Sequence, residues 1–446
     1  MNSNRRVLQF VSGSVCLYLL LSVAAVLSGF KWMPFKRVNL ISDVVSGDST
    51  ALLTDKPDSN VVIIEDLPEK DFSLYTKPRL ITSFNRDAGK PSLNNFLQKL
   101  YELKSGKKQK IRIAYFGDSM IEGDLLTQTV RKLLQLHFGG SGVGFVPVTS
   151  QVSKFRQSVI HNYSGGWQDE NFKTGKTGKL YFSGHLFRSS GDWVQMVDQT
   201  ITDSAAVIEK SLICGNGGTV SIHVNGSPVN INAVNMLNRI PLATDMNRSI
   251  KLSVANENLP VYGISFESPA GIFVDNFSFR GITGIEFARV DSVFMKAIAA
   301  NNPYDLIVFQ YGVNLLFRPN DRNFNWYGKD MLPVVRKIRN CFDKTDFLVV
   351  STADRAFRYG GEYKSAVGID SLIKIQATVA YETGSSFYNQ FASMGGTNSI
   401  VEWAKRNPSL ANRDYVHPNH RGAEVLGTWL YEAIISEYNK YIRTRK

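Results

Sequence analysis

An apolar, strand-like run over residues 110–116 ends in Gly117-Asp118-Ser119-Met120 and is followed closely by a helix-like run over residues 125–138. A buried strand that turns directly into a helix is the building unit of parallel sheets, so this order strongly limits the possible folds. It also leaves Ser119 at the edge of the sheet, where the helix presents free N–H groups and the positive end of its dipole. An oxyanion formed at Ser119 would be stabilised there, which is a catalytic arrangement rather than a packing one.

Strand and helix patterns alternate again in the last third of the chain. Strands are predicted at residues 306–310, 346–351 and 385–388, and helices at 330–341, 371–383 and 421–438. Alternation at this spacing is typical of an α/β, doubly wound parallel sheet, which carries its active groups at the carboxyl ends of the strands. Ser119 and Asn314 both follow predicted strands and are therefore expected at that edge.

Asp414 and His417 lie three residues apart in a loop-like stretch and complete, with Ser119, the side chains of a serine hydrolase. A serine hydroxyl needs a base within hydrogen-bond reach, and that base needs a third group to hold its tautomer. One short turn can supply both Asp414 and His417, whereas the fold must bring Ser119 to them. His420 is a rival base, but its place in the first turn of a helix capped by Asn419 favours a solvated or ligand-adjacent role.

Each of these pieces has a purely structural alternative. Gly-Asp-Ser is common in turns and at helix caps, Gly312-Val313-Asn314 is an ordinary exit from a strand, and His417 alone can be a loop histidine with its hydrogen bonds satisfied. Their joint occurrence in chain order favours a hydrolase site. The histidines at positions 137, 161, 185 and 223 show no clustering with carboxylates or thiols, so we predict no metal and no cofactor.

At these residues the chain resembles the SGNH/GDSL hydrolase family, a family with a flavodoxin-like three-layer fold. The matching blocks are Gly117-Asp118-Ser119, the turn at residues 281–284, Tyr311-Gly312-Val313-Asn314, and Asp414 to His417. The resemblance implies Ser119 as nucleophile, His417 as general base and Asp414 as the group that orients the base.

The same resemblance implies an oxyanion hole made by the Ser119 N–H, the Gly284 N–H and the Asn314 side chain. Gly281 is the alternative to Gly284. Leu315 stands where many members of the family have an aspartate. This departure bears on loop support more than on the chemical step, because the donor Asn314 is present.

The first two blocks are separated by some 160 residues, far more than a strand-helix-strand unit needs. Between residues 150 and 275 the sequence changes to short alternating strands broken by Gly, Asn and Ser, which is typical of a β-sandwich. The chain here resembles peptidoglycan O-acetylesterases of the family, which carry an inserted carbohydrate-binding-like sandwich. Trp167, Tyr163 and Trp193 are candidates for stacking on sugars, with packing in the sandwich core as the equal alternative.

The chain of 446 residues is too long for one hydrophobic core, and we expect several units. These are a membrane anchor at 1–35, a linker or stalk at 36–82, a hydrolase domain at 83–149 and 276–446, and the sandwich at 150–275. The run at 7–30 carries no ionisable side chain except Cys16 and is long enough to span a bilayer, although a cleaved signal peptide is the alternative. Cys214 and Cys341 are expected as free thiols, and the catalytic domain is expected in the periplasm or outside the cell.

The net charge of +12 suggests an anionic surrounding such as membrane lipid or cell-wall polymer. Nucleic acid ranks low as a partner, because no basic cluster interleaved with aromatic residues occurs. The resemblance implies a serine esterase that removes O-acetyl groups from a polysaccharide, with peptidoglycan the first candidate. A membrane-associated O-acetyltransferase with the same triad and a non-catalytic glycan-binding surface protein are the alternatives.

Overall fold

The computed structural model describes residues 75, 77–82, 93–107 and 109–445. The apolar run at 7–30 and nearly all of the expected linker at 36–82 lie outside the described residues. Among the helices that are described, none has both the length and the apolar character needed to cross a membrane.

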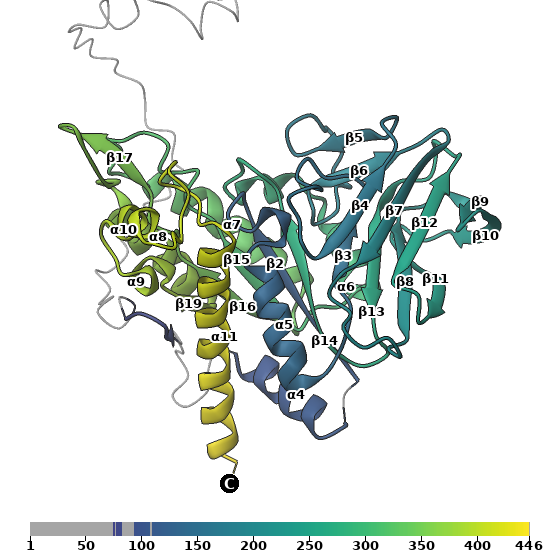
Figure 1. Cartoon of the computed structure of the whole chain (residues 1–446), viewed down its shortest axis with the longest axis horizontal. Coiled ribbons are helices and arrows are strands. Elements are labelled where there is room, and N and C mark those ends of the chain that lie inside the picture. Colours follow the sequence, from purple (N-terminus) through teal and green to yellow (C-terminus); the bar gives the residue numbers. More distant parts are fainter. Residues whose placement is uncertain (1–74, 76, 83–92, 108, 446) are drawn as a thin grey trace, which may run out of the picture. The chain divides into compact units, whose positions relative to one another are not determined.

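A six-stranded sheet forms the centre of the α/β domain (Figure 1). In spatial order its strands are β1 (Ile81–Thr82), β19 (Ser386–Tyr388), β16 (Asp346–Val350), β15 (Leu306–Gln310), β2 (Lys110–Gly117) and β14 (Gly271–Ser278). All neighbours pair in parallel except β1 and β19. Numbered along the chain, the five parallel strands have the spatial order 2-1-3-4-5 of flavodoxin-like sheets. The order reverses between β2 and β15, so the carboxyl ends of these two strands flank the expected binding crevice.

Helices cover both faces of this sheet. One layer consists of α4 (Asn94–Lys104), α5 (Thr127–Phe138) and α11 (His420–Arg443), which lie in front of the sheet in Figure 1. The other consists of α6 (Ser292–Asn301), α7 (Asn325–Cys341) and α8 (Ile369–Thr383). Along β2, Ile113 and Tyr115 pack into the first layer, and Ala114 and Phe116 into the second. Because both faces are buried, the strands of this sheet are continuous apolar runs.

Short elements complete the α/β domain at its edges. They are the 3-10 helices η2 (Glu122–Asp124) and η3 (Ile285–Arg289), the helices α9 (Gln390–Met394) and α10 (Ser399–Lys405), and the hairpin β17 (Ala356–Tyr359) with β18 (Glu362–Ser365). Two of these adjoin the strand ends that matter here: η2 follows β2, and η3 follows the loop after β14.

The inserted region is a β-sandwich of two antiparallel sheets. One sheet contains β10 (Ser227–Ala233), β9 (Gly218–Val224), β12 (Ser249–Val254), β7 (Asp192–Asp198) and β4 (Val159–Tyr163). The other contains β11 (Asn238–Asp245), β8 (Ile208–Cys214), β13 (Val261–Glu267), β6 (His185–Arg188), β5 (Gln168–Asn171) and β3 (Gly144–Pro147), which pairs with β13. Their inner faces form a separate apolar core.

The insertion starts and ends earlier than the expected residues 150 and 275. β3 already belongs to the sandwich, whereas β14 pairs with β2 along its whole length and belongs to the α/β domain. The two connections touch, because the Ile272 N–H donates to the Gly139 carbonyl at 3.0 Å. A Cβ on Gly271 would lie 2.2 Å from the Gly140 Cα, so neither connection has room for a side chain at this point.

A buried ionic cluster also joins the two domains. Glu267 of β13 is fully buried and pairs with Arg112 of β2 at 2.7 Å, with Lys110 at 3.0 Å and with Arg239 of β11 at 3.1 Å. Burial alone would raise the pKa of Glu267, but the charges of Arg239 and Arg112 outweigh it and hold the pKa well below its usual range. The sandwich is therefore held to the α/β domain by paired charges as well as by its two connections.

Candidate active site

Ser119 lies at the carboxyl end of β2, two residues beyond Gly117. A Cβ on Gly117 would come within 2.8 Å of the Ile121 side chain and 3.1 Å of the Gln310 carbonyl, so only glycine permits this turn. Ser119 is partly exposed beyond it. Among the described residues, no acceptor lies within hydrogen-bond reach of the Ser119 N–H. The turn thus presents both a hydroxyl and a free N–H at the sheet edge.

Asp414 and His417 reach Ser119 from the loop before α11. The His417 Nε2 lies 2.9 Å from the Ser119 Oγ, and the His417 Nδ1 lies 2.7 Å from the Asp414 Oδ2. The Asp414 Oδ1 accepts hydrogen bonds from the N–H groups of Val416 and His417, at 3.0 and 3.1 Å. The loop is closed by a bond of 2.9 Å from the Asn412 N–H to the His417 carbonyl. The three side chains expected to act together are therefore in one hydrogen-bonded line.

Asp414 is exposed at the outer end of this line, with 45% of its side chain accessible. Burial would raise its pKa, but hydrogen bonds from the His417 ring and from the N–H groups of Val416 and His417 outweigh burial and lower the pKa to about 2. An ionised Asp414 favours the His417 tautomer with the proton on Nδ1, which leaves Nε2 free to accept the Ser119 proton.

Asn314 lies on the other side of Ser119, at the exit of β15. Its Nδ2 donates to the Asp118 Oδ2 at 3.0 Å and to the Ile282 carbonyl at 2.9 Å. Both N–H groups of the amide are thus engaged, and the second bond ties the loop after β14 to the loop after β15. The expected oxyanion donor is at the catalytic edge, but it must exchange one of these two bonds in order to bind an oxyanion.

Asp118 is fully buried beneath the nucleophile. Its Oδ1 accepts from the Met120 N–H at 2.9 Å, and its Oδ2 accepts from Asn314. Burial raises the pKa of Asp118 to about 7, although the Met120 N–H and the charge of His417 lower it in part. No role for Asp118 could be predicted from the sequence, because its contact with Asn314 depends on how close the ends of β2 and β15 come. The only signal in the sequence is that Asp118 adjoins Ser119.

Gly284 and Gly281 lie in the loop that Asn314 holds. Gly284 has a φ of +92° and directly precedes η3, and a Cβ there would lie 2.8 Å from the Tyr311 ring. The Gly284 N–H finds no acceptor among the described residues. Gly281, with a φ of +80°, instead faces the sandwich, since its Cβ position lies 3.3 Å from the Lys173 Nζ. These positions favour Gly284 over Gly281 as an oxyanion donor.

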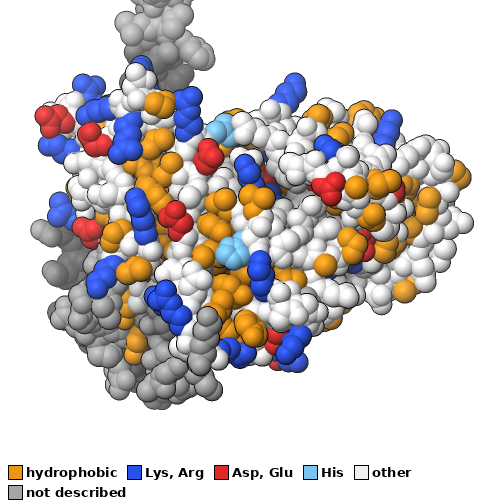
Figure 2. Space-filling view, turned by 60° about the horizontal axis from the view of Figure 1, so that its bottom comes forward, with side chains coloured by type: hydrophobic (Ala, Val, Ile, Leu, Met, Phe, Trp, Pro, Cys, Tyr) orange, Lys and Arg blue, Asp and Glu red, His pale blue; other side chains and the backbone are white. Residues whose placement is uncertain are grey.

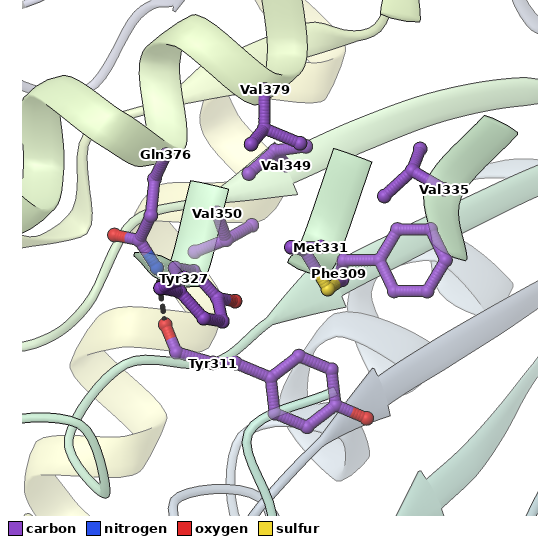
Figure 3. A pocket seen from close by; sticks show the side chains of 9 residues that line it. All are labelled: Phe309, Tyr311, Tyr327, Met331, Val335, Val349, Val350, Gln376 and Val379. Atoms are coloured by element: carbon purple, nitrogen blue, oxygen red, sulfur yellow. Dashed lines mark hydrogen bonds between the residues drawn. The ribbon is translucent and has the colours of Figure 1, made fainter. Parts of the chain in front are cut away.

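The segment that leads to Asn314 rests on a small interior cavity (Figure 3). The Gln376 side chain of α8 donates to the Tyr311 carbonyl at 2.6 Å and accepts from the Thr352 N–H at 2.8 Å, so it fixes the exits of β15 and β16 together. The cavity between Tyr311, Met331 and their neighbours measures about 10 Å³ and is lined almost entirely by apolar side chains. A space of this size holds at most about one water, so it is a packing void rather than a ligand site.

His420 does not contact Ser119. It starts α11, and its ring lies against Phe155 with centroids 4.5 Å apart. Burial lowers the pKa of His420. Phe155, which sequence reasoning missed, is 46 % exposed and lies close enough to Gly123 that a Cβ there would approach its ring to 2.9 Å. A loop of the insertion thus places the exposed Phe155 ring next to η2. Phe155 belongs to no motif or periodic pattern, so nothing in the sequence indicated this position.

The three aromatic residues proposed as sugar contacts differ in their surroundings. Trp167 packs into the sandwich core and donates its ring N–H to the Trp193 carbonyl at 3.1 Å, so the packing alternative describes it. Tyr163 is partly buried against the same core and donates its hydroxyl to the Ser150 carbonyl at 2.8 Å. Trp193 is half-buried and lies 4.9 Å from the Lys251 ammonium.

Neither metal ligands nor a disulfide accompany these side chains in the described ranges. No group of three or more His, Cys, Asp or Glu is arranged there to hold a metal ion. Cys214 and Cys341 are buried free thiols.

The sheet order, the two helical layers and the position of these side chains give the chain the SGNH/GDSL hydrolase fold. The solved structure of a peptidoglycan O-acetylesterase in action is similar to it, with 22% identity and a TM-score of 0.68, and the match covers 81% of this chain and 99% of that one. So large a share exceeds the α/β domain alone, which means that the likeness includes the sandwich.

Two weaker likenesses are to family two carbohydrate esterases. The one from Cellvibrio japonicus has 10% identity and a TM-score of 0.27, with 64% of this chain and 99% of that chain covered. The one from Clostridium thermocellum, in complex with cellohexaose, has 10% identity and a TM-score of 0.26, with 61% and 99% covered. TM-scores this low carry no argument. No protein-family model and no curated protein matches the chain.

Proposed function

We propose that the protein is a serine esterase that removes O-acetyl groups from a polysaccharide, with cell-wall peptidoglycan as the first candidate. The observation that carries the proposal is the pair of hydrogen bonds that joins the Ser119 Oγ to His417 and His417 to Asp414. The N–H groups of Ser119 and Gly284, which find no acceptor among the described residues, are the proposed oxyanion donors. The likeness in fold to a peptidoglycan O-acetylesterase supports the choice of polymer.

The proposed reaction has two steps. In the first, the Ser119 Oγ attacks the acetyl carbonyl while its proton passes to the His417 Nε2, and the N–H groups of Ser119 and Gly284 bind the oxyanion. The C–O bond to the sugar breaks, the sugar oxygen takes the proton from Nε2, and acetyl-Ser119 remains. In the second, water gives a proton to Nε2 as its oxygen attacks the acetyl carbonyl. The bond from this carbon to the Ser119 Oγ then breaks, Oγ takes the proton back from Nε2, and acetate leaves.

Asn314 joins the oxyanion hole by exchanging its bond to the Ile282 carbonyl for one to the oxyanion. Its bond to the buried Asp118 keeps the amide nitrogen pointed toward the catalytic edge during this exchange. A donor held in advance costs little reorganisation at the moment of reaction.

We also propose that the catalytic domain works at the cell envelope, outside the cytoplasm. The support is the apolar run at residues 7–30 and the net charge of +12. Lys and Arg side chains are spread widely over the face shown in Figure 2, with fewer Asp and Glu among them. Such a surface is attracted to anionic envelope polymers and lipids. Protease treatment of intact cells tests this location, because an outward-facing domain is digested and a cytoplasmic one is protected.

The direct test is acetate release by the full-length protein from O-acetylated peptidoglycan and from acetylated xylan. We expect release that Ser119→Ala abolishes and that Ser227→Ala, an exposed serine on β10 of the sandwich, leaves unchanged. Mass spectrometry of the quenched reaction is expected to find the acetyl group on Ser119. Release that persists in Ser119→Ala would refute the proposal, and transfer of acetyl to an added glycan without release would replace the esterase by a transferase.

A further inference from the structure

A polar cleft lies between the sandwich and the catalytic edge of the sheet. It has a volume of about 270 Å³. Glu122 and Gly123 line it from the turn directly after Ser119, and Ser278 lines it from the carboxyl end of β14, opposite Gly117. Asn276, Phe279 and Arg280 line it from β14 and the loop after β14, and the sandwich supplies the rest of the wall. The cleft therefore lies beside the turn that follows Ser119, and most of its lining residues belong to the insertion.

Lys173 enters this cleft from the loop after β5. The Asn171 Oδ1 accepts from the Lys173 N–H at 2.9 Å and shapes the turn. Arg289, at the end of η3, donates to the carbonyls of Phe172 and Gly175 on either side of Lys173. These bonds tie the loop to the segment that follows Gly284, and thereby bring the Lys173 ammonium to the loop that carries Gly281 and Gly284.

Other cations that line the cleft already have carboxylate partners. Arg280 pairs with Glu122 at 2.6 Å, and Arg156 pairs with the buried Asp124 at 3.4 Å. Lys173, by contrast, has no ion pair or hydrogen bond from its ammonium to any described residue. Its ammonium lies 5.6 Å from the centre of the Phe279 ring, on which the side chain rests.

The acidic side chains near Lys173 in sequence are also engaged elsewhere. The Glu170 Oε1 accepts from the N–H groups of Lys176 and Thr177, at 3.1 and 3.0 Å. The Asp169 Oδ1 lies 2.8 Å from the His185 Nδ1, and its Oδ2 accepts from the Asn171 Nδ2 at 3.0 Å. Asp169 is therefore held by two neighbours of its own, and Lys173 remains the free cation of this cleft within the described part of the chain.

A second, independent observation concerns Ser183, which also lines the cleft. The residue is 3 % exposed, and its hydroxyl has no hydrogen-bond partner among the described residues. A buried polar group without a partner costs free energy unless a ligand or water satisfies it. Ser183 thus offers a hydroxyl donor to the same space that receives the unpaired ammonium.

We propose that this cleft binds a carboxylate carried by the acetylated glycan, with Lys173 as the cation that pairs with it and Ser183 as a further hydrogen-bond donor. The carboxylate belongs either to the sugar ring or to a peptide attached to the sugar. The inference rests on the proposed function, because it treats the cleft as a subsite that positions the sugar whose acetyl group lies at Ser119.

The test uses the full-length protein and matched substrate pairs. One pair is O-acetylated oligogalacturonide with free carboxylates and its methyl ester. The other is an O-acetylated peptidoglycan disaccharide-peptide with free and with amidated peptide carboxylates. The measured quantity is the ratio of kcat/KM for the free carboxylate to kcat/KM for the masked one.

We expect a ratio above one for the wild type in at least one pair, and that pair identifies the source of the carboxylate. Lys173→Gln is expected to lower the ratio about fivefold, as for an exposed ion pair, and Lys173→Arg to restore most of it. Lys176→Gln is the matched control, because Lys176 is an exposed lysine of the same loop outside the cleft lining. The ratio is also expected to fall with added salt.

The inference and the proposed function fail in different ways. If hydrolysis depends on Ser119 but Lys173→Gln leaves both ratios unchanged, the carboxylate subsite is refuted and the esterase stands. If no ester is hydrolysed, the esterase is refuted, and calorimetric binding of non-acetylated oligogalacturonide and of the deacetylated disaccharide-peptide tests the cleft alone. Tighter binding of either by wild type than by Lys173→Gln would then support the subsite, and equal binding of both would refute it.

Discussion

Replacing Asp118 by asparagine tests how the catalytic edge is held together. The two carboxylate oxygens accept one bond each, from the Met120 N–H at 2.9 Å and from the Asn314 Nδ2 at 3.0 Å. An asparagine keeps the shape but offers a single oxygen, so its own NH₂ group must face one of these donors. If the Met120 bond survives, Asn314 loses the partner that keeps its amide pointed toward Ser119.

The expected loss follows from the kind of bond that is removed. Above about pH 7, where Asp118 is ionised, a hydrogen bond to this charged group contributes about 1.5–3 kcal/mol, and a loss of this size in the transition state lowers kcat by roughly 10- to 100-fold. This stays below the 10²- to 10³-fold expected for removing an oxyanion-hole donor outright, as in Asn314→Ala.

The same substitution that lowers kcat should raise the stability of the variant relative to the wild type as the pH rises. Because burial raises the pKa of Asp118 from 3.8 to about 7, the folded state keeps a proton that the unfolded chain releases. The free energy of unfolding of the wild type therefore falls as the pH rises from about 4 to 7, by at most about 4 kcal/mol. Asp118→Asn lacks this term, so its stability relative to the wild type should increase over the same range.

The assay compares kcat on a small acetyl ester, and urea unfolding at pH 5 and 8, for Asp118→Asn, Asn314→Ala and the double variant. If both residues act through one amide, the double variant is no slower than the slower single variant. Asp343→Asn, an exposed aspartate, is the matched control. A wild-type kcat in Asp118→Asn, or losses that multiply in the double variant, would refute the reasoning.

Three further changes probe other parts of the structure. Asp414→Asn should lower kcat about 100-fold or more by releasing the His417 tautomer. Because the pKa of Asp414 is lowered to about 2, its stabilising contribution is present above 3.8 and should disappear in urea unfolding as the pH falls toward 2. Gly284→Ala should cut kcat at least tenfold and lower Tm, since φ is +92° and the new Cβ meets Tyr311. Glu267→Gln should cost about 3–5 kcal/mol in calorimetric unfolding by leaving buried cations unpaired, and an unchanged Tm would contradict the domain-joining role of Glu267.

Much of the α/β domain could be predicted from the sequence, because strands buried on both faces are continuous apolar runs. β2, β15 and β16 lie within a residue of their expected bounds, and α5 ends at the expected residue. α7 begins at Asn325 instead of residue 330, and the helix continues through Pro333. The hairpin of β17 and β18 was not predicted.

The boundary at β14 shows what local pattern cannot reveal. The strand contains Asp275 and Asn276, both buried, and their polarity resembles the alternation of the sandwich. Asp275 is satisfied by Tyr304 and by the Phe145 N–H, which are distant in sequence. The order of the motifs along the chain identified Ser119, His417 and Asp414 as candidates. The structure places the same three side chains in hydrogen-bond contact. The role of Asp118 depends on a distance between two strand ends and has no local signal.

The contact between the two connections of the sandwich also bears on how the domain could be removed. Gly139 and Ile272 are hydrogen-bonded to each other, so the chain leaves and re-enters the α/β domain at nearly one point. Excision of residues 140–270 with a short turn in their place would rejoin α5 to β14 without moving either element. Such a minimal enzyme would keep the hydrogen-bonded side chains of Ser119, His417 and Asp414 and would lose Lys173. Arg112 would have to be replaced by an apolar residue, because its partner Glu267 would be gone. Comparing it with the full chain would separate cleavage of the ester from recognition of the polymer.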